Sequence, residues 1–198
     1  GYPHFMLKEI HEQPRALADT FRGRISLKEG EVSLEGIHLK PGDVKRIKRI
    51  HLVACGTAWH AALVGKFMIE EIARMPAEAD YGSEFRYRSP LIDSHSLLLL
   101  ISQSGETADT LAAVDMARAK KAKIISICNV VDSSLARKSA GVLYTHAGPE
   151  ISVASTKAFT TQLAALYLLA IGLGRLSGRL KRAEAKRLME DLMYLPHW

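Results

Sequence analysis

The sequence predicts an α/β protein with three layers, αβα, built around a five-stranded parallel sheet. From Arg49 onward, short apolar runs alternate with segments in which apolar residues recur every three or four positions, a pattern typical of strand–helix–strand units. The runs at residues 97–101 and 124–127 are apolar along nearly their whole length, which suits central strands that helices cover on both faces. A chain of 198 residues is long enough to bury one such core.

Five predicted strands follow one another along this part of the chain. They cover residues 50–54, 77–81, 96–101, 123–128 and 141–146. Helices are predicted over about residues 58–73, 107–120 and 155–173. The last helix is apolar on every face, which implies burial inside the domain or at a contact between subunits. If the strand order is 2-1-3-4-5, the loops after the first and third strands border the same crevice.

Two further segments flank the predicted sheet. Residues 7–20 are predicted to form one helix that carries Pro14, and an irregular glycine-rich stretch follows it. Residues 179–194 have the pattern of a charged amphipathic helix. We therefore divide the chain into an N-terminal helical arm and linker at 1–45, a domain at 46–175, and a C-terminal helix at 176–198.

The composition excludes several classes of protein. Hydrophobic residues make up 47% of the chain and charged residues 24%, which is typical of a folded globular protein. Two cysteines are too few for a secreted disulfide framework, and the N-terminus lacks the pattern of a secretory leader, so we expect a cytoplasmic protein. The longest apolar stretch, residues 163–173, is about half of a membrane span, so no membrane partner is expected.

The net charge of +6 does not indicate nucleic-acid binding. Most of the excess lies between Arg175 and Arg187, and no aromatic residues stand between these basic residues. Such a segment is typical of a solvated helix face, so nucleic acid is not an expected partner.

The strongest functional signal is the turn after the third predicted strand, residues 102–107. It offers hydroxyls at Ser102, Ser104 and Thr107, an amide at Gln103, and a glycine, all directly before a predicted helix. The free N–H groups and the positive dipole end of a helix N-terminus favour an anion. Because the turn has no lysine or arginine, we expect a phosphate monoester and not a nucleoside triphosphate. The alternative is a simple helix cap, for which one hydroxyl would be enough.

Other site chemistry is not indicated. The only close G-x-G pair, Gly172 and Gly174, lies inside a helical run and not after a strand, so no nucleotide cofactor is expected. The eight histidines lack metal-ligand spacing, so no metal is expected either. Cys55, at the end of the first strand, is either a small buried hydrophobic residue or part of the site wall.

The turn at residues 102–107 resembles the phosphosugar-binding signature of the sugar isomerase (SIS) domains, whose fold has a flavodoxin-like strand order. The closer similarity is to the first SIS domain in the isomerase part of the glutamine–fructose-6-phosphate aminotransferase family. The matching stretches are residues 11–14 (HEQP), 55–57 (CGT), 83–88 (SEFRYR), 102–110 (SQSGETADT), 127–130 (ICNV) and 150–162 (EISVASTKAFTTQ).

The resemblance implies that the chain binds a hexose 6-phosphate such as fructose 6-phosphate or glucosamine 6-phosphate. The implied phosphate-binding residues are Ser102, Gln103, Ser104 and Thr107, and the implied sugar-binding residues are Thr57, Val153 and Ser155. Further candidates are Gly56, Ala58, Gly105 and Lys157. Ala58 stands where the family often has a serine, and Glu106 is expected to shape the turn instead of acting as a base.

The resemblance also implies which parts of the reaction lie elsewhere. The family makes glucosamine 6-phosphate from fructose 6-phosphate and glutamine, a transferase step of amino sugar biosynthesis. Its glutaminase domain precedes this region, and its isomerisation base, ring-opening histidine and Schiff-base lysine belong to the second SIS domain or its tail. We therefore expect no catalytic residue in this chain and no turnover by it alone. The apolar residues 158–173 predict a homodimer.

Two alternatives remain open at this point. The chain could be a stand-alone phosphosugar isomerase that takes its base from a neighbouring subunit, or a sugar-phosphate sensor without catalysis. The sensor is less favoured because the segment before the predicted sheet has no helix-turn-helix pattern.

Overall fold

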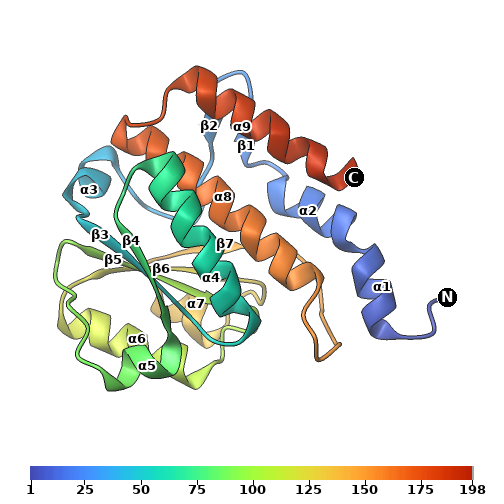
Figure 1. Ribbon diagram of the computed structural model, residues 1–198, viewed down its shortest axis with the longest axis horizontal. Coiled ribbons are helices and arrows are strands. Elements are labelled where there is room, and N and C mark those ends of the chain that lie inside the picture. The colour runs from blue at the N-terminus through green and yellow to red at the C-terminus, as the bar shows by residue number, and fades with distance from the viewer. Residues whose placement is uncertain (198) are drawn as a thin grey trace.

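The computed structural model describes residues 1–197, and its centre is a sheet of five parallel strands. The strands are β3 (Arg49–Ala54), β4 (Ala77–Tyr81), β5 (Ser96–Ser102), β6 (Lys123–Cys128) and β7 (Gly141–Tyr144). They lie in the order β4-β3-β5-β6-β7, which is 2-1-3-4-5 along the chain. The predicted α/β fold and strand order are confirmed (Figure 1).

Helices cover both faces of this sheet. One face carries α3 (Pro41–Arg46), α4 (Thr57–Met68) with a π-helical extension (Ile69–Ala73), and α8 (Lys157–Ser177). The other carries α5 (Gly82–Tyr87), α6 (Ala108–Ala119) and α7 (Ser134–Lys138). Strand β5 is buried along its whole length. Its side chains alternate as the pleat requires: Leu97, Leu99 and Ile101 join the core under α4 and α8, while Leu98 and Leu100 join the core under α6.

The two flanking segments pack together on the outer side of α8. They comprise α1 (Phe5–His11), α2 (Gln13–Phe21), a short hairpin of β1 (Ile25–Ser26) and β2 (Glu31–Val32), α9 (Arg182–Tyr194), and a 3-10 turn (Leu195–His197). The apolar residues of α2, β2 and α9 form a separate core cluster with Leu168 and Ile171 of α8, whereas those of α1 are exposed. The predicted burial of the apolar helix is confirmed, and the chain itself provides the cover on both sides.

Helix α8 is also long and apolar enough, by length and composition alone, to span a membrane. It has 21 residues and a most apolar window with mean hydropathy 1.3, but 67% of that window is buried inside the protein. Its apolarity is therefore explained by its place between the two clusters.

Several element boundaries differ from the prediction. The predicted single helix over residues 7–20 is two helices, α1 and α2, and Pro14 stands in the first turn of α2, where its missing N–H needs no partner. The stretch between this arm and the sheet contains the β1–β2 hairpin and α3, which were not predicted. Strand β7 ends at Tyr144, two residues early, and α9 begins at Arg182.

Candidate functional site

The loops that follow β3 and β5 lie next to each other at the carboxyl ends of the strands. These strands pair in parallel, with Ala54 opposite Ile101, so both chains leave the sheet at the same end. The direction in which the chain moves across the sheet reverses between these two strands. The chain passes from β3 to β4 on one side of the sheet, and from β5 to β6 on the other. Ligands of open parallel sheets bind at such a reversal point.

A cavity of about 270 Å³ opens at this end of the sheet. It is lined by Cys55, Thr57, Ala58, Ile101, Ser102, Gln103, Ser104, Thr107, Glu150, Ser152, Val153, Ser155 and Gln162. All seven residues predicted to bind the substrate are in this set, although they come from three separate segments of the chain. The structure therefore brings the predicted residues together around one space.

Hydrogen bonds fix the shape of the turn at residues 102–107. The Ser102 hydroxyl accepts a bond from the Gly105 N–H at 3.0 Å and lies 3.2 Å from the Thr107 hydroxyl. The Ser104 hydroxyl accepts a bond from the Glu106 N–H at 3.2 Å. Gly105 has φ +70°, a left-handed conformation that favours glycine. The turn thus presents three hydroxyls toward the cavity from a fixed backbone.

The start of α6 lacks a side-chain cap within the described residues, unlike the start of α8. Thr107 is the N-cap residue of α6, and its side chain makes no capping bond. At α8, the Glu150 carboxylate already accepts bonds from the N–H groups of Thr156 at 2.8 Å and Ala158 at 3.1 Å. The first N–H groups of α6, next to the cavity residue Thr107, therefore lack a side-chain acceptor among the described residues, and such groups favour an anion.

Glu106 points away from the cavity and ties the turn to α7. Its carboxylate accepts a hydrogen bond from the Ser134 N–H at 2.7 Å. This backbone bond is the main cause of the lowered pKa of Glu106. Its position agrees with the expectation that Glu106 shapes the turn.

The four additional candidates have different positions. Ala58 lines the cavity, whereas Gly56, with φ +57°, lies outside its wall and donates its N–H to the Tyr81 hydroxyl at 3.0 Å. Gly105 contributes backbone shape. Lys157 is 3% exposed and belongs to a neighbouring cavity of about 200 Å³.

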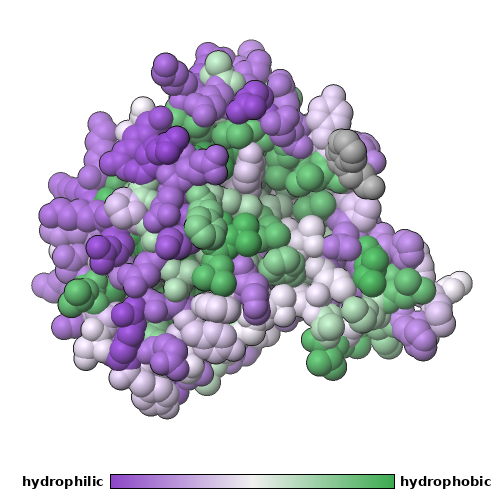
Figure 2. Space-filling model, in the orientation of Figure 1, coloured by the Kyte–Doolittle hydropathy of each residue, from purple (hydrophilic) through white to green (hydrophobic). Residues whose placement is uncertain are grey.

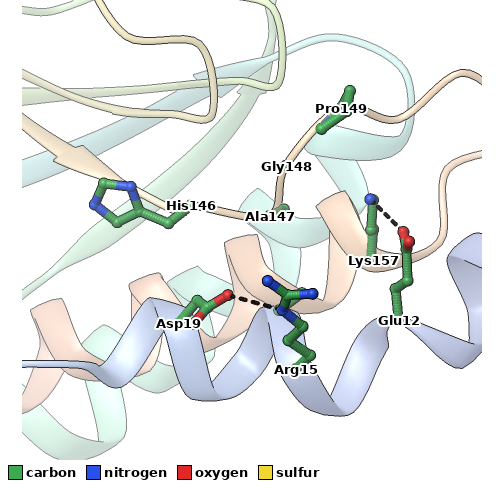
Figure 3. A pocket seen from close by; sticks show the side chains of 9 residues that line it. Glu12, Arg15, Asp19, His146, Ala147, Gly148, Pro149 and Lys157 are labelled. Carbon is green, nitrogen blue, oxygen red and sulfur yellow. Dashed lines mark hydrogen bonds and ion pairs between the residues drawn. The ribbon is translucent and has the colours of Figure 1, made fainter.

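Lys157 is bonded to the N-terminal arm. Its Nζ lies 2.7 Å from the Glu12 carboxylate, and Figure 3 shows the side chain directed at Glu12. The bonds from Lys157 and Lys8 lower the pKa of Glu12. Lys157 thus joins α8 to the arm and does not line the predicted site.

Three polar residues of the cavity wall are not among the predicted site residues: Glu150, Ser152 and Gln162. Gln162 is only 4% exposed, and its Oε1 atom has no hydrogen-bond partner within residues 1–197. Gln162 could have been recognised from the sequence as a polar residue directly before the apolar run at residues 163–173. Glu150 and Ser152 lie in a segment without a helix or strand. In such a segment, the spacing of residues along the sequence does not indicate where their side chains point.

One group of described residues has the composition of a metal site. His51, Glu78 and Asp80 have possible ligand atoms within 4.8 Å of one another. However, the Arg88 guanidinium lies 2.6 Å from Asp80 and 3.6 Å from Glu78 and already forms an ion pair with each of them. None of the three lines the cavity, so the group has no part in the candidate site.

Comparison with known proteins identifies the fold and its relatives. A model of the SIS domain matches residues 44–172. The chain belongs to the SIS domain family. It is 55% identical over 196 residues to the isomerizing glutamine–fructose-6-phosphate aminotransferase of Symbiobacterium thermophilum, covering 99% of this chain and 32% of that protein. The corresponding protein of Clostridium tetani is 51% identical over the same share of each chain.

A solved structure gives the same result. The C-terminal domain of the glucosamine-fructose-6-phosphate aminotransferase of Francisella tularensis superposes with a TM-score of 0.93 at 40% identity, covering all of this chain and 55% of that one. This SIS domain chain therefore spans about a third of the length of the curated relatives that it matches.

Proposed function

We propose that this chain is the first SIS domain of an isomerizing glutamine–fructose-6-phosphate aminotransferase and that its cavity binds a hexose 6-phosphate. The observation that carries the proposal is the convergence of the seven predicted residues on one cavity at the uncapped start of α6. The similarity to aminotransferases along 99% of the chain supports this function over a stand-alone isomerase or a sensor.

The phosphate would bind at the 102–107 turn. The hydroxyls of Ser102, Ser104 and Thr107 and the N–H groups of α6 donate to its oxygens, and the helix dipole stabilises its charge. Thr57, Val153 and Ser155 line the remaining wall and would contact the sugar. This division predicts that phosphate supplies much of the affinity and that the sugar contacts supply selectivity.

Turnover requires groups that the described residues of the cavity wall do not supply. Isomerisation of an aldose or ketose needs a general base that is free to accept a proton. Glu150 is the only acid among the described residues of the wall, and both its oxygens accept bonds from the Ser155–Ala158 segment. We therefore assign catalysis to the remaining two thirds of the full protein, with a glutaminase domain and a second SIS domain as intramolecular partners.

The proposed division of the chain follows from this assignment. The arm at residues 1–45 would connect to the glutaminase domain, residues 46–175 would bind the sugar phosphate, and residues 176–198 would lead toward the second SIS domain. Cys55 and Cys128 are both free thiols, which is consistent with the proposed cytoplasmic location.

Titration calorimetry of the 198-residue chain with fructose 6-phosphate and glucosamine 6-phosphate tests the proposal. Replacing Ser104 and Thr107 together by alanine should weaken binding by about 10-fold or more, because buried phosphate oxygens lose two donors. The exposed Ser94, replaced by alanine, is the control and should leave affinity unchanged. Equal affinity in the double variant and the native chain would contradict the assignment, as would turnover of a sugar phosphate by the isolated chain.

A further inference from the structure

A buried carboxylate outside the cavity is bonded to the segment that forms one of its walls. Glu9 of α1 is only 2% exposed. Its carboxylate accepts hydrogen bonds from the N–H of Ile151 at 2.6 Å, from the N–H of Ser152 at 3.3 Å, and from the Ser152 hydroxyl. Glu9 lies 143 residues from Ser152 in the sequence and precedes the matched SIS region.

The segment that Glu9 holds has no helix or strand of its own. Residues 145–156 form only bends and irregular backbone between β7 and α8. Ser152, Val153 and Ser155 of this segment line the cavity, and the Val153 side chain is fully exposed. Three sets of contacts hold this segment. Asn129 binds Ala147 and Gly148 near β7, at 2.8 and 2.7 Å, and Glu150 binds Ser155 and Thr156 at the entry to α8. Of these three side chains, Glu9 is the one that binds Ile151 and Ser152, directly before Val153.

Two further contacts fix α1 and α2 against the start of α8. Glu12 pairs with Lys157 at 2.7 Å, and the Gln13 amide oxygen accepts a bond from the Thr160 hydroxyl at 2.5 Å. These two contacts reach α8, whereas Glu9 reaches the cavity wall itself. The ribbon shows α1 lying beside the loop that enters α8 (Figure 1). The arm is thus a fixed support from which Glu9 can position the wall.

The chemistry of the bonds suits this role. A carboxylate that leaves water loses favourable solvation, which bonds from several N–H and O–H donors restore. Here the donors come from two consecutive residues of one loop, so the charge is satisfied only when that loop has one particular shape. An apolar residue at position 9 could fill the space without imposing a shape on Ile151 and Ser152.

We propose that Glu9 is a positioning residue of the sugar-phosphate site: it holds Ser152 and Val153 in place against the sugar part of the ligand. The inference rests on the proposed function of the cavity. The phosphate turn is supported independently of α1, since Gln103 accepts a bond from the Asn129 N–H at 3.2 Å and Glu106 is bonded to Ser134. Loss of Glu9 therefore disturbs the sugar wall and leaves the phosphate turn intact.

Calorimetry with two probes tests this separation. The native chain, Glu9→Ala and Glu9→Gln are titrated with glucosamine 6-phosphate and with inorganic phosphate. Glu9→Ala should raise the Kd for the sugar phosphate by about 10-fold while leaving the Kd for phosphate unchanged. Glu9→Gln keeps one acceptor oxygen and should fall between the native chain and Glu9→Ala. Met6→Gln, at a 43% exposed position of the same helix, is the matched control and should bind both probes as the native chain does.

A second measurement keeps the test valid if Glu9→Ala folds poorly. Amide hydrogen exchange of Ile151 and Ser152 should be faster in the isosteric Glu9→Gln variant, while exchange in β5 stays slow. Equal loss of affinity for both probes, or no loss for either, would overturn the positioning role alone. Failure of the native chain to bind glucosamine 6-phosphate would overturn the proposed function and this inference with it.

Discussion

At Gly105 the turn that leads into α6 has room for a hydrogen atom and not for a methyl group. A Cβ at this position would lie 2.1 Å from the Ser133 hydroxyl oxygen, and the φ of +70° disfavours any other residue. The close approach holds the 102–107 turn against the start of α7, where Leu135 donates its N–H to the Gly105 carbonyl at 3.0 Å. Glycine is therefore needed here for both space and backbone shape.

Replacing Gly105 by alanine should lower the free energy of unfolding by about 2–4 kcal/mol, from the sum of backbone strain and the forced contact. Gly178 is the matched control, because it has φ +76° with no atom within 4 Å of an added Cβ, so its alanine variant reports strain alone. Urea denaturation of both variants measures the difference. Equal losses at the two positions would show that the Ser133 contact has no energetic weight.

Single residues also mark the limits of reading this site from sequence. The 102–107 turn could be predicted because its hydroxyls and glycine are adjacent in the chain and follow a strand whose apolar run is unmistakable. Glu9 could not be predicted, because its partners are more than 140 residues away and its spacing in α1 is that of an ordinary surface acid. The role of Glu9 depends on where its side chain points and on its burial, and both are known only from the folded structure.

At the level of elements, the central strands could be predicted well because β5 and β6 are buried along nearly their whole length and therefore appear as continuous apolar runs. The β1–β2 hairpin, with two-residue strands, is too short for any alternation to be visible. The break between α1 and α2 leaves both halves in helical spacing, so one longer helix was the simpler interpretation. The apolar sequence of α8 predicted that the helix is covered. It did not indicate that α2, β2 and α9 provide the cover.

The pairing of β3 with β4 places a histidine in an environment that opposes its protonation. His51 is 1% exposed, neither ring nitrogen has a hydrogen-bond partner within residues 1–197, and its ring contacts Phe85. Burial lowers the pKa of His51, although Glu78 and Asp80 partly offset this effect and Arg49 and Arg88 add to it. The native state therefore keeps this side chain neutral at a pH where the unfolded chain takes up a proton.

The stability of the fold should fall as the pH drops below about 6.5, the usual value for histidine. Below that value the unfolded state binds a proton that native His51 does not, which lowers the free energy of unfolding by at most about 1.4 kcal/mol per pH unit. Urea denaturation between pH 7.5 and pH 5 measures this slope. His51→Leu should have a shallower slope, and His60→Leu, at an exposed position, should keep the native one. The same slope in all three proteins would rule out His51 as its source.

For the whole molecule, the structure changes the physical basis of the predicted homodimer. The homodimer was predicted from the apolar face of residues 158–173, but α8 is covered by the sheet and α4 on one side and by α2, β2 and α9 on the other. Apolar side chains are exposed on α1, where Phe5 is 58% and Ile10 39% exposed, and also beside α8. Figure 2 shows apolar side chains gathered over α4 and the adjoining part of α8. Val64 is 39% exposed and Phe67 is 64% exposed, next to a groove of about 340 Å³ lined by Met68, Leu163, Tyr167 and Leu192.

If the chain forms a homodimer, this patch is the surface that association would cover, because a contiguous exposed apolar area is unfavourable in water. Phe67→Glu places a charge at its most exposed point and should shift the protein to monomer in sedimentation velocity at micromolar concentration. Leu91→Glu, at an 85% exposed leucine in the loop before β5, is the control and should leave the sedimentation coefficient at the native value. A native chain that sediments as a monomer would end the dimer prediction for this part of the protein. If Phe67→Glu still forms a dimer, the interface does not include this part of α4.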